Sequence, residues 1–422
     1  MQRIRMFYED NKIWLYILRY ILIAIVLSIT AILIDTKFVG VLTFIPSIFL
    51  TSIDLAKVIL ATLAGALLTI TTFTFSTIMV VLTMYSSEFS PRVVDNFLND
   101  KISMKVLGIF VGGFLYCIST LFFMKNSFSN YLVISASIAV AYSILSIIYF
   151  VIFVYSVSSS IQATKLIGRL YDESYTIIEK ALDDRKNQIG LDNYEVGTYA
   201  KHIDIHADRN GYLELISFNS ILERLKDFDS KIIIKPRIGE FIYKNQNIAR
   251  LYYNYEELDE NIDETILKPF SIEEGRIAFN DYQFSIQKII DIALRALSPG
   301  INDPNTAIHC INIIGVLLSK LGEIEGKYTV IKEDGYKAVV IYEDFNFKED
   351  IYLSFYQILH YGKEDISVIA AMFDALKGMS LSVEGKNLNT IREFKDYIYT
   401  SSKDNFHHKF DLDFLEMKKD KI

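Results

Sequence analysis

Four long apolar runs near the start of the chain constrain its fold more than any other feature. They cover residues 13–34, 58–85, 104–124 and 131–157. Each approaches or exceeds the roughly 20 residues that a helix needs to cross a hydrocarbon layer of about 30 Å. The first run continues for 22 residues without a small-residue cleavage site, so we expect it to be retained. The sequence therefore predicts a domain of four transmembrane helices over residues 1–157.

The charge balance changes where the last apolar run ends. Residues 1–155 hold 10 Lys/Arg and 7 Asp/Glu, a net of +3, and since the whole chain carries −8, the remainder carries −11. An acidic soluble domain argues against nucleic acid as a partner. The basic residues that flank the runs are split eight to three, with the larger group near the N-terminus and after the second and fourth runs. The positive-inside rule then predicts that both termini are cytoplasmic.

The second run carries a hydroxyl at almost every helical turn. On a helix, eight residues at steps of three or four fall on one face, which we call the hydroxyl stripe: Thr62, Gly65, Thr69, Thr72, Ser76, Met79, Thr83 and Ser86. Against another helix, such a stripe permits close approach and hydrogen bonds of about 0.6–2 kcal/mol each. Against water, Thr62, Thr69, Thr72, Ser76 and Thr83 would line a polar path. Both interpretations stay open. The second requires a homo-oligomer, because the four helices of one chain are few to enclose a pore.

Two further expectations concern the same helix. Thr71 and Thr74 lie off the stripe, and we expect their hydroxyls to bond back to carbonyls of the preceding turn. The helix is also predicted to continue beyond the membrane through YSSEFSPRVVDNFLND, where Glu88 and Arg92 could pair at a spacing of four.

Residues 158–257 change from a helical to a strand pattern. We expect a helical linker over 158–198 that prolongs the fourth run, followed by a small β-rich module over 199–257. The segment RIGEFIYKNQNIA resembles the half-motif of a barrel-sandwich hybrid, although a carrier's exposed lysine signal is missing, so we interpret the module as structural. His202 and His206 alternate with Asp204 and Asp208, which in a strand defines one polar face rather than a metal site.

Residues 258–400 return to a mostly helical pattern with one hairpin, whose turn is predicted at Glu333-Asp334-Gly335. Two helices meet at SPGINDP, residues 298–304, where Asp303 is placed to cap the second helix and Pro304 to begin it. Arg295, Asn302 and Asp303 are the candidate interaction residues of this corner. Several polar residues could converge near it: Arg276, Asp281, Asn302, Asp303, Thr306 and His309. The charged tail over 401–422 is expected to fray.

Three segments give the chain a family resemblance. IDIALRALSPGINDPNTAI, SSEFSPRVVDNFLND and GYLELI together resemble a family of bacterial membrane proteins called domain of unknown function 2254. The resemblance is collinear over most of the chain and implies a protein of the bacterial inner (cytoplasmic) membrane, with no activity attached. One departure is Asn305, which stands where the family usually has a bulky or aromatic residue.

The sequence favours a binding or conducting role over catalysis. His309 and Cys310 are adjacent, so on a helix they point about 100° apart and cannot easily act as base and nucleophile. Asp291 and Arg295, four residues apart, are better explained as a structural ion pair. We expect no enzyme activity and no cofactor. The leading hypothesis is an oligomeric channel-like or transport-like assembly in the lipid bilayer, with the acidic domain as regulator. The rival hypothesis is a non-conducting scaffold that recruits a cytoplasmic protein through the corner.

Overall fold

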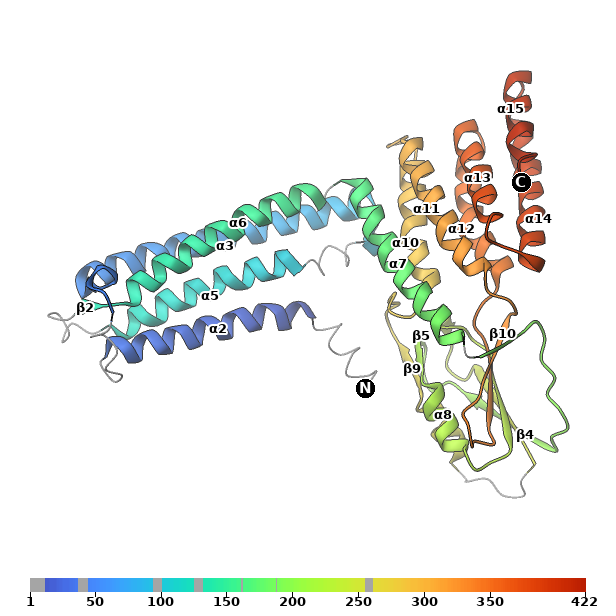
Figure 1. Cartoon of the computed structure of the whole chain (residues 1–422), viewed down its shortest axis with the longest axis horizontal. Coiled ribbons are helices and arrows are strands. Elements are labelled where there is room, and N and C mark those ends of the chain that lie inside the picture. The colour runs from blue at the N-terminus through green and yellow to red at the C-terminus, as the bar shows by residue number, and fades with distance from the viewer. Residues whose placement is uncertain are drawn as a thin grey trace. The chain divides into compact units, whose positions relative to one another are not determined.

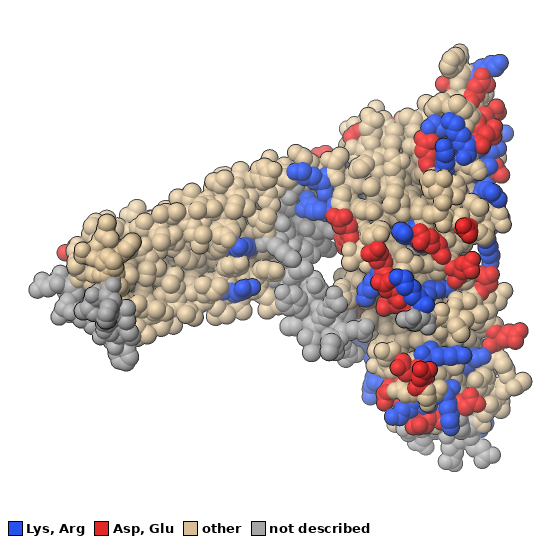
Figure 2. All heavy atoms as spheres, in the orientation of Figure 1, with Lys and Arg blue, Asp and Glu red and all other residues tan. Residues whose placement is uncertain are grey.

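The computed structural model describes residues 12–36, 45–93, 101–124, 132–160, 162–186, 188–254 and 261–422 (Figure 1). The chain divides into two compact units, Met1–Lys165 and Leu166–Ile422, which we call the membrane unit and the C-terminal unit. Figure 2 shows a surface almost free of charge on the first and interspersed acidic and basic side chains on the second.

Four apolar helices form the membrane unit: α2 Lys12–Asp35, α3 Ile53–Glu88, α5 Lys101–Phe123 and α6 Ser135–Ser160. Each contains a segment long and apolar enough to cross a membrane, which confirms the four predicted spans. Their outward-facing surface is hydrophobic and exposed, as lipid contact requires.

Helix α3 is longer at its start and shorter at its end than predicted. Its 36 residues extend over about 54 Å. It ends at Glu88, and Pro91 opens a separate short 3₁₀ turn, so the predicted continuation through SPRVVDNFLND is wrong. A proline cannot donate the next helical hydrogen bond, and it disfavours helical backbone at the preceding residue. The last part of that segment, residues 94–100, lies outside the described residues.

Helix α5 packs against α2, α3 and α6 and is the most buried of the four spans. Glycines allow its closest approach to α2. A Cβ atom added at Gly108 would lie 3.1 Å from Tyr20 Cβ, and one at Gly112 would lie 2.9 Å from Ala24 Cβ. Small residues drive helix association in membranes because they bring backbones into van der Waals contact.

At the end of the unit where α3 and α6 begin, two short strands pair with each other. β1 Thr51–Ser52 pairs with β2 Leu132–Val133 in antiparallel fashion. Asp35 accepts hydrogen bonds from the backbone N–H groups of Ile134 (2.8 Å) and Ser135 (3.3 Å). A carboxylate therefore satisfies donors at the start of α6, where the helix has no internal partners for them.

The C-terminal unit includes most of α7, Ala163–Arg185, and contains two sheets. The larger sheet has the order β3-β10-β11-β6-β8-β4, and the smaller has the order β7-β5-β9. The strands of the larger sheet are β3 Ile189–Leu191, β4 Lys201–His206, β6 Ser230–Ile234, β8 Asn247–Tyr253, β10 Tyr328–Ile331 and β11 Val339–Glu343. Those of the smaller are β5 Gly211–Ile216, β7 Phe241–Ile242 and β9 Phe270–Glu273. A core of isoleucine, leucine and tyrosine side chains from both sheets also includes α8 Phe218–Leu225 and α9 Ile262–Leu267.

The β-rich region extends beyond the segment 199–257. Four of its strands come from outside that segment, namely β3, β9, β10 and β11. The hairpin β10-β11 forms as predicted, with Gly335 at φ +83° in its turn. Its second strand pairs in parallel with β6, so the hairpin is part of the main sheet rather than an appendage of the helices.

Six helices complete the unit and gather at one end of it, beside one end of the strands (Figure 1). They are α10 Tyr282–Ala296, α11 Pro304–Gly322, α12 Phe347–Gly362, α13 Ile366–Met379, α14 Gly385–Ser402 and α15 Lys409–Lys419. The expectation of a fraying tail is wrong, because α15 docks on its neighbours. Leu415 is fully buried, and Lys418 Nζ lies 2.5 Å from Asp374 Oδ2.

Candidate functional site

The hydroxyl stripe is exposed along its whole length within the single chain. All eight of its residues are solvent-accessible or lipid-accessible in the membrane unit. The buried residues of α3 include Ala56, Leu60, Ala64, Leu67, Ile78 and Val81. At 100° per residue these residues lie on the opposite side of the helix from the stripe. The seam inside this chain therefore uses the other face of α3, and the stripe faces outward, toward lipid, water or a partner outside the chain.

The threonine hydroxyls of the stripe already have acceptors within the helix. Thr62 Oγ1 donates to Val58 O at 2.8 Å, and Thr69 Oγ1 donates to Gly65 O at 2.9 Å. Thr72 and Thr83 do the same to the carbonyls four residues before them, at 3.0 and 2.9 Å. The stripe thus presents no unsatisfied threonine donor, and what it offers outward is oxygen lone pairs and small side chains.

The two threonines off the stripe behave differently from each other. Thr71 Oγ1 donates to Leu67 O at 2.7 Å, as expected. The same expectation for Thr74 is wrong: its side chain is fully buried, and its hydroxyl has no hydrogen-bond partner among the described residues. Packing against the neighbouring helices therefore decides how the Thr74 side chain is oriented.

The SPGINDP corner forms the predicted turn between α10 and α11. Asp303 caps α11, accepting from Thr306 N at 3.1 Å and from Thr306 Oγ1 at 2.6 Å, and these bonds lower the pKa of its carboxyl. Pro304 is the first helical residue. Asn302 has φ +51°, a conformation that asparagine tolerates better than most residues. Arg295 and Asn302 are exposed, whereas Asp303 is half-buried and occupied by its cap.

The wider convergence expected at the corner does not occur. Arg276 Nε pairs with Asp281 Oδ2 at 2.6 Å, and Asp281 caps the start of α10, about 22 Å of helix away from the corner. Asp291 accepts a bond from Gln287 Nε2 at 2.9 Å. Cys310 is fully buried, and burial raises the pKa of its thiol well above the usual value.

The histidine-containing strand β4 has a cross-strand ion pair. Asp204 Oδ1 lies 2.5 Å from Arg250 Nε of β8, and the two residues are register partners in the sheet. The hydrogen bond from Arg250 holds the pKa of Asp204 below its ordinary value. The carboxylate is therefore used within the sheet.

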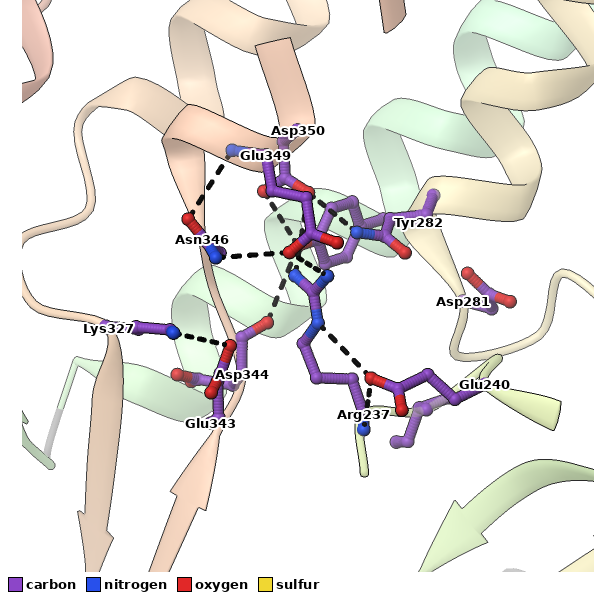
Figure 3. A network of polar contacts seen from close by, with 12 residues as sticks. Arg237, Glu240, Asp281, Tyr282, Lys327, Glu343, Asp344, Asn346, Glu349 and Asp350 are labelled. Carbon is purple, nitrogen blue, oxygen red and sulfur yellow. Dashed lines mark hydrogen bonds and ion pairs between the residues drawn. The ribbon is translucent and has the colours of Figure 1, made fainter. Parts of the chain in front are cut away.

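A buried polar network that the sequence analysis did not find lies where the strands meet α10 and α12 (Figure 3). At its centre is Arg237, which is 7% exposed and lies between β6 and β7. Its Nη2 donates to Glu349 Oε2 at 2.7 Å, and its Nη1 lies 3.7 Å from Asp350 Oδ1. Asp350 also accepts from Tyr282 Oη at 3.0 Å and from Gln283 Nε2 at 2.7 Å. We call this the Arg237–Asp350 network.

A second buried pair borders this network. Arg185, the last residue of α7, donates through Nη1 to Asp344 Oδ1 at 2.6 Å. Its Nη2 donates to the carbonyls of Glu325 and Gly326, each at 2.7 Å. Thr329 Oγ1 donates to the other oxygen of Asp344. One guanidinium thus joins the end of α7 to both strands of the β10-β11 hairpin region.

Burial dominates the electrostatics of both acids. Desolvation raises the pKa of Asp344 to about 6 against the opposing charge of Arg185, and raises the pKa of Asp350 to about 6 against the bond from Gln283 and the charge of Arg237. Both carboxyls therefore hold their protons to a higher pH than an exposed aspartate does. The sequence signal for these buried charges is weak: Asp344 directly follows strand β11 and Arg237 comes three residues after the end of β6, positions where charges are usually solvated.

These features define the class of the protein. It is a membrane protein with four apolar helices, followed by a mixed α/β unit that contains two sheets and a helical cluster. More particularly, the chain belongs to the family described as predicted membrane protein (DUF2254), whose profile matches residues 10–378. This confirms the family resemblance drawn from the sequence.

The chain is similar to two mycobacterial proteins. Proteins described as uncharacterised, from Mycobacterium bovis and Mycobacterium tuberculosis, are each 22% identical to it over 334 residues. These alignments cover 77% of this chain and 64% of each relative, so the chain matches somewhat less than two thirds of the relatives' length. No solved structure matches the chain.

Proposed function

We propose that the protein is an oligomeric, channel-like or transport-like assembly of the cytoplasmic membrane, in which α3 of each copy turns its hydroxyl stripe toward a shared polar path. The supporting observation is the position of the stripe opposite the seam that α3 makes within its own chain. Lipid contact would leave the oxygen lone pairs without donors. Water in a path, or a donor on a second copy, would use them.

The flanks of the stripe support an oligomeric arrangement. Large exposed apolar side chains border it on both sides: Phe73 and Val80 on one side, Leu68 and Phe75 on the other. In a ring of copies, the stripe would face the axis and these flanks would contact adjacent subunits. The C-terminal unit would then regulate the path from the cytoplasm, since the eight-to-three split of basic residues favours an orientation with both termini on that side.

An acidic residue next to the stripe indicates which kind of solute the path would carry. Asp54, in the first turn of α3, is exposed and lies on the same side of the helix as the stripe at 100° per residue. Copies arranged about an axis would bring these carboxylates together at one mouth. Rings of acidic side chains favour cations.

A flux assay on the purified chain in vesicles tests the proposal. Ser76→Leu places an apolar side chain on the stripe and is expected to reduce ion flux at least several-fold, whereas Ser76→Cys retains a small side chain and should conduct until a charged thiol reagent is added. Val151→Leu on α6, a residue 62% exposed outside the stripe, is the matched control. An absence of flux in the parent under any ion gradient, or unchanged flux in Ser76→Leu, contradicts the proposal.

The exposure of the SPGINDP corner favours a second function, a non-conducting scaffold that recruits a cytoplasmic protein. Arg295 and Asn302 are free of the capping role that occupies Asp303. Affinity capture with Arg295→Ala and with Asn302→Gly tests this, since glycine accepts the positive φ and removes only the amide. An unaltered set of captured proteins would count against recruitment at this corner.

A further inference from the structure

A groove between α12 and α14 has the size and the lining of a small-molecule site. Its volume is about 510 Å³, within the range of roughly 300–1,000 Å³ that ligand pockets occupy. Aromatic rings and charged side chains make up most of its lining: Lys348, Glu349 and Tyr352 from α12, and Glu393, Phe394 and Tyr397 from α14. It is separate from the hydroxyl stripe and from the SPGINDP corner.

The aromatic side of the groove is accessible and held in place. Tyr352 is 44% exposed and Tyr397 is 38% exposed, and their ring centroids are 6.0 Å apart at an interplanar angle of 47°. Tyr352 stacks on Tyr356 at 5.2 Å, and Phe394 lies 5.3 Å from Tyr397. The faces of tyrosine rings carry negative charge density, which attracts cations, so two exposed rings that line a cavity suit a cationic ligand.

The charged side of the groove carries two carboxylates and one ammonium. Glu349 is fixed by bonds from Arg237 Nη2 and Asn346 Nδ2, and both bonds are made to Oε2. Lys348 Nζ contacts Glu393 Oε2 at 2.9 Å, but these side chains are 74% and 65% exposed. An ion pair so exposed contributes little, so Glu393 can exchange its lysine for another cation at small cost.

We propose that this groove binds a small, water-soluble organic cation, an alkylammonium or quaternary ammonium compound. The rings of Tyr352 and Tyr397 contact the cationic group, and Glu393 balances its charge, while Glu349, already paired with Arg237, adds an acceptor oxygen to the groove. The chemistry that recognises the ligand is the combination of π faces with a carboxylate, because the rings also accept apolar molecules and a carboxylate also accepts metal ions. This inference is independent of conduction through α3.

Calorimetric titration of the full detergent-solubilised chain with choline and with spermidine tests the proposal. The neutral isostere 3,3-dimethylbutan-1-ol has the shape of choline without its charge. At least one of the two cations is expected to bind with a Kd in the millimolar range or below, and the neutral isostere at least several-fold more weakly than choline if choline is the cation bound.

Variants on the two walls separate the contributions. Tyr397→Leu keeps the groove apolar and should weaken cation binding by roughly threefold to thirtyfold. Glu393→Gln should also weaken it, while Lys348→Met, which removes the competing ammonium, should strengthen it. Unchanged unfolding midpoints show that each variant is folded. Equal binding of choline and its neutral isostere, insensitivity to Tyr397→Leu, or no binding of either cation at about 10 mM overturns the proposal.

Discussion

The hydroxyl stripe and the Arg237–Asp350 network both place polar atoms in apolar surroundings, and they satisfy those atoms by opposite means. On α3, each threonine of the stripe bonds to a carbonyl four residues before it. In the network, the bonds join residues that are 67 to 112 positions apart in the chain. A local bond forms with the helix itself and leaves the outward face available. A distant bond exists only in the complete fold, so it stabilises that fold and fails when one partner is lost.

The largest effect is expected from removing the centre of the network. Arg237→Met leaves Asp350 and Glu349 without their cationic neighbour, and the loss of one partner from a buried charged pair costs about 3–5 kcal/mol. The urea unfolding midpoint of the C-terminal unit, followed by circular dichroism of the full chain, should fall accordingly. Arg209→Met is the control, because Arg209 is exposed and pairs with the exposed Asp208. Similar shifts in the two variants would show that the network contributes no more than a surface ion pair.

The pH dependence of stability gives the second test. A carboxyl with a higher pKa in the folded chain than in the unfolded chain binds a proton on folding, so its contribution is greatest in acid and is lost as the pH rises. For Asp350, with an ordinary pKa of 3.8 and a folded pKa of about 6, the loss falls between about pH 4 and 6. It amounts to roughly 3 kcal/mol at most.

Subtraction isolates this contribution from acids such as Asp204, whose lowered pKa acts in the opposite direction. The free energy of unfolding is measured from pH 4.5 to 7.5 for the parent and for Asp350→Asn. The parent's value minus the variant's is expected to decrease with rising pH. A difference that is flat or increases would place the Asp350 carboxyl in a more polar environment than its burial indicates.

An intermediate effect on stability is expected at the SPGINDP corner, where the Asp303 side chain makes local hydrogen bonds that stabilise only the start of α11. Asp303→Ala removes the cap of α11 and should lower the free energy of unfolding by about 0.5–2 kcal/mol. Asp303→Asn retains most of the cap and is the matched control. If both variants unfold like the parent, the Thr306 bonds do not stabilise α11 measurably.

The smallest effect separates the two kinds of threonine on α3. Thr74→Val replaces a buried, unpartnered hydroxyl by a methyl of similar size and should be neutral or stabilising by up to about 1 kcal/mol. Thr69→Val removes a hydroxyl with a local bond on the exposed stripe and should leave thermal stability within a few tenths of a kcal/mol. Thermal unfolding in detergent measures both. Clear destabilisation by Thr74→Val would mean that a neighbouring atom uses this hydroxyl.

The sequence predicts local features of this protein well and distant ones poorly. The four spans, the hairpin and the Asp303 cap depend on runs and turns that are legible within about 20 residues. The Arg237–Asp350 network depends on which segments meet, and nothing near Arg237 in the chain indicates Tyr282 or Glu349 as neighbours. Pro91 marks the end of α3 within the sequence itself, but the spacing of four between Glu88 and Arg92 favoured a continued helix. Thr74 shows the reverse case, where packing overrides a local preference.

The parallel pairing of β6 with β11 has a consequence for how the chain is made. β6 ends at Ile234, yet the strand that covers its second edge ends only at Glu343. During synthesis, one edge of the apolar run KIIIK therefore stays unpaired while more than a hundred further residues are made. The helices of the membrane unit have already been synthesised by then. A chain truncated inside that interval would expose this apolar edge and be prone to aggregate, so a chaperone that covers the edge would protect the nascent chain.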